Sequence, residues 1–388
     1  MATRLPIGIQ NFEKLITNNY VYVDKTACIH NLMNANGETF FLSRPRRFGK
    51  SLLLSTMQAI FEGKKQLFEG LFIYDKIEWK SNPVIMLDMS QNAENIETLK
   101  ESLGVSLKRI AANNNIKISY NDPSIIFSEL IHQLYKKSSC QVVVLVDEYD
   151  KPILDAIDDL ERASEIRNFL QTFYTVIKSS GAYLQFVMLT GVSKISQTSI
   201  FSGLNNMKDI SLNDEYSAIC IYTQQELESN FNVDILALTN KYETTYATML
   251  EKIKHWYNGY SWNGNVFVYN PFSVLLLFND QTFLAHWFNT GTPAFLLKLL
   301  NERNDFSVLL QDEIEVNSDF ANKQGLEKMD VVPLCFQTGY LTIKKADFRT
   351  GTLWLKVPNH EVRMALTESI LTDFTKQADY KVHVLAKY

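Results

Sequence analysis

The sequence is poor in the residues that build metal centres and disulfide frameworks. Its four cysteines are scattered with no CxxC pair, and its six histidines are equally dispersed. A structural zinc site needs about four such ligands at short spacing, and a disulfide framework needs cysteines at paired spacings in a secreted chain. The sequence therefore predicts reduced thiols and no zinc centre.

Long hydrophobic runs are also lacking. No stretch approaches the ~20 apolar residues that span a bilayer. The N-terminal MATRLPIGIQNFEKL has no apolar centre of the kind that signal peptides carry. Together with the unpaired cysteines, these absences predict a cytoplasmic protein with no membrane partner.

The composition is that of a folded protein with more than one unit. The 388 residues are 46% hydrophobic and 21% charged, and they contain no internal repeat or Ser/Gly linker. A chain of this length is expected to form two or three units. The formal net charge of −5 gives no overall attraction to nucleic acid. DNA binding therefore stays open and would depend on local basic clusters.

The main motif is the stretch TFFLSRPRRFGKSLLLSTMQAIFE at residues 39–62. An apolar run predicts a strand, and apolar residues at helical spacing predict a helix that stops near Gly63. The loop between them matches a Walker A phosphate-binding loop, with Lys50 on the phosphates and Ser51 on Mg²⁺. The nucleotide-binding residues predicted for this loop are Arg44, Pro45, Arg46, Arg47, Phe48, Gly49, Lys50, Ser51 and Leu52.

The loop departs from the usual pattern GxxxxGK[ST], because Arg44 stands where the first glycine is expected. That glycine normally supplies a turn with positive φ, which an arginine adopts only at some cost. Pro45 also restricts Arg44 to extended conformations. The loop is therefore expected to open differently from the standard one. A GKS tripeptide also occurs by chance at helix starts, so the assignment needs its context.

Two acidic residues after a buried strand supply that context. The stretch QVVVLVDE at residues 141–148 predicts a central parallel strand with Asp147 and Glu148 at its carboxyl end. Ligand-binding residues gather at that edge of a parallel sheet. This is a Walker B pattern, in which Asp147 holds the magnesium shell and Glu148 orients or deprotonates the attacking water. The alternative is an exposed strand end or a helix cap.

The next predicted strand, residues 182–190, ends in Thr190-Gly-Val-Ser-Lys194. A polar residue beside the magnesium strand can sense the γ-phosphate, so Thr190 is the candidate and Ser193 or Lys194 comes second. A turn of small residues is the alternative. The strand at 83–90 ends in Asp88, whose carboxylate is expected at the same edge of the sheet as the phosphate-binding loop. A strand-end aspartate is more often a cap or turn residue, so Asp88 is not assigned to the site.

Strands and helices alternate through about residue 215. This pattern predicts an α/β fold with a parallel sheet and helices on both faces. With the phosphate-binding loop and the two acids, it predicts a P-loop NTPase core. The expected division is a lead-in at 1–38, an ATPase core at 39–215, a helical region with a hairpin at 216–330, and a small α+β segment at 331–388. The hairpin turns at Asn263-Gly264, and mixed strands are predicted over 331–357. The region after the core is expected to be mostly helical and winged-helix-like.

Several stretches together resemble the bacterial AAA-ATPase-like proteins that carry a C-terminal PD-(D/E)XK nuclease domain. They are GIQNFEKL, YVDKT, FLSRPRRFGKSLLLS, VVVLVDEYDKPI, LTGVSKIS, FSGLNNMKDISL, WYNGYSW, VYNPFSVL and VPNHEVR, in family order. RPRRFGKS is the usual loop of that family, which implies nucleotide and magnesium roles for Lys50 and Ser51. Asp147, Glu148 and Thr190 take the metal, water and sensor roles. The family nuclease would begin after VPNHEVR, and no acid-then-ExK strand pair follows, so no nuclease activity is expected from this chain.

The sequence thus predicts an ATPase that uses ATP and Mg²⁺ to change the conformation of an attached or partner effector, with a role on DNA left open. A non-hydrolysing nucleotide-dependent switch is the alternative. Glu148 favours hydrolysis. No NKxD run specifies guanine. Arg44, Arg46 and Arg47 are candidates for an arginine finger within the chain. Tyr22, Asp24 and Lys25 are expected either near the base or as a strand and cap.

Overall fold

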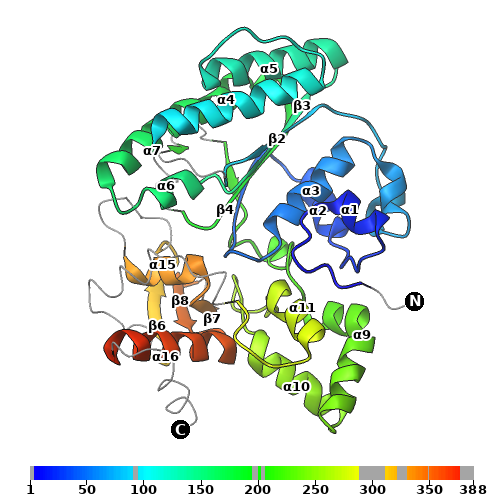
Figure 1. Cartoon of the computed structure of the whole chain (residues 1–388), viewed down its shortest axis with the longest axis vertical. Coiled ribbons are helices and arrows are strands. Elements are labelled where there is room, and N and C mark those ends of the chain that lie inside the picture. The colour runs from blue at the N-terminus through cyan, green and yellow to red at the C-terminus, as the bar shows by residue number, and fades with distance from the viewer. Residues whose placement is uncertain are drawn as a thin grey trace.

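The computed structural model describes residues 4–90, 95–194, 200–201, 206–287, 311–320, 330–347 and 349–375, with side chains to residue 368. Its upper half in Figure 1 is a layered α/β domain. Its lower half holds a helical group and a small antiparallel sheet side by side. Within the described residues, no helix is both long and apolar enough to cross a membrane.

The upper domain is built on a five-stranded parallel sheet. Its strands are β1 (Thr39–Ser43), β2 (Val84–Asp88), β3 (Val142–Asp147), β4 (Leu184–Gly191) and β5 (Lys208–Asp209), in the order β2-β3-β4-β1-β5. The four longer strands lie where the sequence predicts them. β4 pairs directly with β3, as expected for the strand that carries Thr190.

Helices cover both faces of this sheet (Figure 1). Successive residues of β3 point to opposite faces: Val142, Val144 and Val146 join one core, and Val143 and Leu145 join the other. The first core includes α4 (Ile96–Asn113), α5 (Pro123–Ser138) and α7 (Leu160–Ser179). The second includes α1 (Phe12–Thr17), α2 (Thr26–Met33) and α3 (Lys50–Phe61). The predicted fold class is confirmed.

Local signals start and stop these helices as the sequence indicates. The carboxylate of Asp122 accepts hydrogen bonds from the N–H groups of Ser124 and Ile125, and Pro123 is the first residue of α5. α3 ends just before Gly63, which has a φ of 73°. The short α6 (Lys151–Asp155) follows β3 directly.

The chain after the parallel sheet is mostly helical. The predicted helical stretch 227–257 is two helices, α9 (Gln224–Lys241) and α10 (Tyr246–Tyr257), which pack with α11 (Pro271–Asp280) around a third core. Tyr260 and Val268 form an antiparallel bridge on either side of Gly264, which has a φ of 76°. The predicted turn is present there. The aromatic residues of this region are largely core rather than exposed stacking surfaces.

The last region has a three-stranded antiparallel sheet in the order β6-β8-β7. Its strands are β6 (Ile314–Asn317), β7 (Thr342–Asp347) and β8 (Thr352–Lys356), accompanied by α15 (Val331–Thr338) and α16 (His360–Thr375). The prediction of strand at 331–338 is wrong. Periodicity cannot separate a short apolar run in a strand from one in a helix, and here Gly339 closes a helix with a φ of 93°.

Candidate nucleotide-binding site

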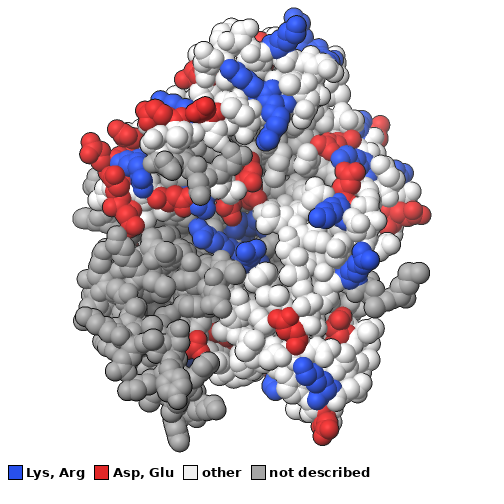
Figure 2. Space-filling view, viewed as in Figure 1, with Lys and Arg blue, Asp and Glu red and all other residues white. Residues whose placement is uncertain are grey.

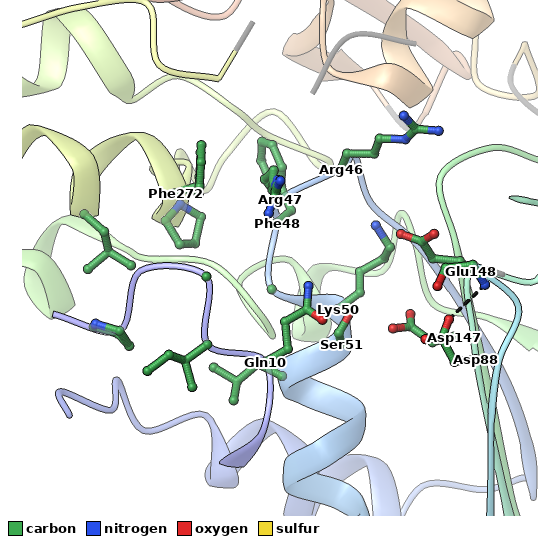
Figure 3. Close-up of a pocket in the computed structure, with 18 of the residues that line it drawn as sticks. Gln10, Arg46, Arg47, Phe48, Lys50, Ser51, Asp88, Asp147, Glu148 and Phe272 are labelled. Carbon is green, nitrogen blue, oxygen red and sulfur yellow. Dashed lines mark hydrogen bonds between the residues drawn. The ribbon is translucent and has the colours of Figure 1, made fainter. Parts of the chain in front are cut away.

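The phosphate-binding loop lies at the carboxyl edge of the parallel sheet, between β1 and α3. It borders a cavity of about 390 Å³, whose lining includes Gly49, Lys50 and Ser51 together with Asp147 and Glu148. Figure 2 shows Lys and Arg side chains gathered around a hollow in the middle of this face, with acidic side chains beside them. Figure 3 shows Lys50 and Ser51 at the helix start, facing the carboxylates.

The conformation of the loop depends on two left-handed residues. Gly49 has a φ of 79°, and a Cβ there would lie 2.4 Å from the backbone oxygen of Cys220, so only glycine fits. Arg47 has a φ of 68°. The left-handed turn that a first glycine would form at position 44 is therefore absent. The loop has a left-handed residue three positions later instead, at Arg47. The N–H of Arg44 donates to the oxygen of Gly191, which extends the β1–β4 ladder by one bond.

The side chain of Arg44 does not belong to the described lining of the cavity, in contrast to the expectation for a nucleotide-binding or finger residue. Its guanidinium is fully buried and donates to the backbone oxygens of Ser43, Ser211 and Tyr216. It also lies 4.1 Å from the ring centroid of Trp262. Burial lowers the pKa of Arg44 to about 10, which still leaves it charged at neutral pH. Arg44 stabilises the loop through these buried contacts.

The other loop residues divide between the cavity and the core. The described lining of the cavity includes Arg46, Arg47, Phe48 and Leu52 but not Pro45. The ring of Phe48 is fully buried in the core, so it reaches the cavity only at its margin. The guanidinium of Arg47 lies over the ring of Phe272, 4.8 Å from its centroid. Arg46 is the arginine of the loop that extends above Glu148 in Figure 3.

Lys50 and Ser51 begin α3 and point into the cavity. The ammonium group of Lys50 donates to the backbone oxygens of Arg44 and Pro45, at 2.9 and 3.0 Å. An ammonium group has three N–H donors, and among the described residues the third has no acceptor. The first turn of a helix also presents unpaired backbone N–H groups and partial positive charge. This end of α3 is therefore suited to bind an anion.

Asp147 and Glu148 lie opposite the helix start, at the end of β3 (Figure 3). Glu148 has a φ of 53°, a left-handed conformation that is uncommon for residues other than glycine. Burial raises the pKa of the Glu148 carboxyl and the charge of Asp147 adds to this, while the charges of Lys50 and Arg46 oppose it. A carboxyl group with a raised pKa beside a phosphate site can accept a proton from water.

Thr190 lies behind Asp147 and does not belong to the described lining of the cavity. Its hydroxyl donates to Oδ1 of Asp147 at 2.6 Å, and it is fully buried. Its place beside Asp147 is as expected, and its role as a sensor of the γ-phosphate stays a prediction. Thr190 orients the carboxylate, and any sensing would pass through Asp147.

The second candidates, Ser193 and Lys194, also point elsewhere. The hydroxyl and N–H of Ser193 donate to the buried carboxylate of Asp150, at 2.9 and 2.7 Å. The ammonium of Lys194 forms an ion pair with Asp209 on β5, at 2.6 Å. The Ser193 contacts hold the chain after β4 against the start of α6, and the Lys194 ion pair holds it against β5. Burial raises the pKa of Asp150.

Sequence reasoning missed several residues that line the cavity. Asp88 is one of them: β2 and β3 place it in register with Asp147, and register cannot be read from a strand in isolation. The opposite wall comes from segments far away in sequence. It contains Pro6, Gly8, Ile9, Gln10, Tyr222, Pro271, Phe272 and Leu275.

Tyr22 and Lys25 line a small cavity that shares Gly49, Leu52 and Tyr222 with the cavity at the loop, so both expectations for residues 22–25 stay open. The carboxylate of Asp24 accepts from the N–H and hydroxyl of Thr26 at the start of α2. The ammonium of Lys25 binds both carboxylate oxygens of Glu226 on α9. The stretch that reaches the cavity lies earlier, at residues 6–10.

Comparison with known proteins gives three findings. The model of a family described as predicted AAA-ATPase matches residues 6–201, slightly more than half of the chain. A protein described as uncharacterized, from the vnfD 5′ region of Azotobacter chroococcum mcd 1, is 41% identical over 380 residues. The match covers 95% of this chain and 70% of that protein.

A solved structure of the Aeropyrum pernix ORC2 protein, in ADPNP–ADP complexes, is 11% identical. The match covers 93% of this chain and 98% of that one with a TM-score of 0.36. The family match and the identity to the Azotobacter protein suffice: the chain belongs to the predicted AAA-ATPase family.

Proposed function

We propose that the protein binds ATP together with Mg²⁺ and hydrolyses it. The observation that carries this proposal is the convergence of the α3 N-terminus, Lys50 and Ser51 on one side of a cavity with Asp147 and Glu148 on the other. Family membership supports the same reading. The absence of a guanine-specifying NKxD run is consistent with adenine.

The side chains around the cavity fit Mg²⁺ delivered with a nucleotide. Magnesium prefers oxygen ligands and is commonly held by one or two carboxylates plus phosphate oxygens. Ser51 and Asp147 offer such oxygens, and the hydrogen bond from Thr190 fixes the orientation of Asp147. Among the described residues no group of three or more His, Cys, Asp or Glu side chains could hold a metal alone. Phosphate oxygens would complete the shell.

Each residue then has a defined task. Lys50 and the loop amides stabilise negative charge on the transferring phosphoryl group, while bound magnesium would neutralise phosphate charge. Glu148 positions the attacking water and accepts its proton, which its raised pKa favours. Arg46 adds positive charge from the loop above Glu148. We assign it the role that an arginine finger plays in other phosphoryl-transfer enzymes.

We also propose that hydrolysis changes the conformation of an attached or partner effector. The cavity is lined by both halves of the molecule, since Phe272 and Leu275 come from α11 and the loop comes from the parallel-sheet domain. A ligand that contacts both halves can shift their arrangement. DNA is one candidate target of such an effector.

Three variants and the wild type test the assignment by ATP binding and by phosphate release with Mg²⁺. Lys50→Ala is expected to bind ATP at least tenfold more weakly, since it removes a charge-assisted contact worth about 1.5–3 kcal/mol. Glu148→Gln is expected to bind ATP normally and lose turnover by about 10²–10⁴-fold. Lys136→Ala, an exposed lysine on α5, is the control.

If the wild type binds ATP but releases no more phosphate than Glu148→Gln, the proposed hydrolysis is wrong and the nucleotide-dependent switch is the better reading. Wild type that does not bind ATP would overturn the whole assignment.

A further inference from the structure

The phosphate-binding loop is held from behind by the C-terminal half of the chain. The ring of Phe48 is fully buried and packs edge-on against Tyr260 and Trp262, with ring centroids 4.8 and 5.9 Å apart. The guanidinium of Arg44 stacks over the same Trp262. Pro45 packs so closely against Gly339 that a Cβ there would lie 3.0 Å from it. The loop therefore depends on residues more than 200 positions away.

Trp287 makes a polar contact with the backbone of the loop. Its indole N–H donates to the backbone oxygen of Arg46 at 3.1 Å. In a planar trans peptide the C=O and the following N–H point in opposite directions. Holding the oxygen of Arg46 therefore also fixes the N–H of Arg47, which points away from Trp287. Arg47 is the left-handed residue of the loop, so this peptide is the one most in need of support.

Glu361 in turn holds Trp287. Its Oε1 accepts the backbone N–H of Trp287 at 2.8 Å and the hydroxyl of Ser273 at 2.9 Å, and its side chain is fully buried. Ser273 belongs to the first turn of α11, next to Phe272 in the cavity wall. One buried carboxylate thus joins the start of α16, the cavity wall on α11 and the tryptophan that holds the loop.

We infer that Trp287 and Glu361 are positioning residues of the nucleotide site, which hold the Arg46–Arg47 peptide in the orientation that binds phosphate. In the usual pattern the first glycine shapes the loop. Here Trp287 and Glu361, from the C-terminal half of the chain, hold the loop backbone instead. The inference rests on the proposed nucleotide binding. Neither residue contacts the nucleotide, and Glu361 acts through Trp287.

The test uses the full chain and isothermal titration with ATP and Mg²⁺. Trp287→Phe keeps most of the ring and removes the N–H donor, and it is expected to weaken ATP binding about fivefold, the value of one hydrogen bond. Binding stoichiometry is expected to stay near that of wild type. A variant that merely unfolds in part would instead show lower stoichiometry with unchanged affinity. Trp354→Phe, on β8 and away from the cavity, is the matched control and is expected to bind like wild type.

Glu361 provides a second, independent arm. Glu361→Gln keeps an acceptor for the backbone N–H of Trp287 and is expected to bind ATP within twofold of wild type. Glu361→Met lacks an acceptor and is expected to bind ATP more weakly. Since Glu361 acts through Trp287, the double variant Glu361→Met with Trp287→Phe is expected to bind ATP no more weakly than the weaker-binding of the two single variants. Additive losses would refute that dependence.

The outcomes separate this inference from the proposed function. If wild type binds ATP and Trp287→Phe binds equally well, the positioning role is wrong and nucleotide binding stands. If wild type does not bind ATP, both are wrong.

Discussion

Glu361 gives the sharpest prediction about stability, because the structure buries a carboxyl group that the sequence places at an ordinary helix start. Burial raises its pKa from 4.5 to about 7, against the opposing effects of the Trp287 N–H, the Ser273 hydroxyl and the His286 N–H. The folded protein therefore holds a proton at this site more tightly than the unfolded chain does. Glu361→Gln removes the titration and keeps the size and the acceptor.

The sign and size follow from linkage. A carboxyl group with a raised folded-state pKa stabilises the folded protein at low pH, and this contribution is lost as pH rises through the folded pKa. One pKa unit corresponds to about 1.36 kcal/mol. Between pH 5.5 and 8 the wild type is therefore expected to lose about 2 kcal/mol of unfolding free energy relative to Glu361→Gln, about four-fifths of it below pH 7.

Urea unfolding of both proteins at half-unit steps of pH measures this difference. Burial also lowers the pKa of His286, which lies next to Trp287 in the chain. It is present in both proteins, so its own contribution largely cancels in the comparison. A difference in unfolding free energy that stays constant from pH 5.5 to 8 would refute the reasoning, since it would mean that Glu361 is ionised in the folded protein throughout.

Two further predictions concern the loop and the metal shell. Gly49→Ala is expected to lower the unfolding free energy by about 2–5 kcal/mol, from the left-handed φ plus the overlap with Cys220. Gly70 has a φ of 81° and open space where a Cβ would lie. Gly70→Ala should therefore lose only the part of the unfolding free energy that comes from the left-handed φ. Equal losses in the two variants would argue against the overlap between a Cβ at position 49 and Cys220. Thr190→Val removes the donor to Asp147 and is expected to raise the Mg²⁺ concentration that half-saturates hydrolysis about tenfold. ATP binding without Mg²⁺ should be unchanged, and an unaltered magnesium dependence would argue against Asp147 as the ligand.

Local sequence determined the parallel-sheet domain and the chemical centre of the site. The run VVVLVD in β3 is apolar on both faces and rich in β-branched valine, which favours a buried strand. Asp122 and Pro123 start α5 by contacts within four residues. Gly49, Lys50 and Ser51 form a helix start by themselves, and chain order alone puts Asp147 and Glu148 at the end of a strand. Each of these signals is contained in a few neighbouring residues, so the sequence sufficed.

Tertiary structure decided which other groups join that centre. Asp88 reaches the cavity only because β2 and β3 pair in register, and Arg44 leaves it because its guanidinium finds buried backbone oxygens on Ser211 and Tyr216. Trp287 meets Arg46 across 241 positions of sequence. Such contacts depend on how separate elements pack, and residues at that separation carry no pattern that periodicity or capping can reveal. The sequence by itself therefore specified the phosphate-binding loop and its acids, and packing of the C-terminal half specified how the loop is supported.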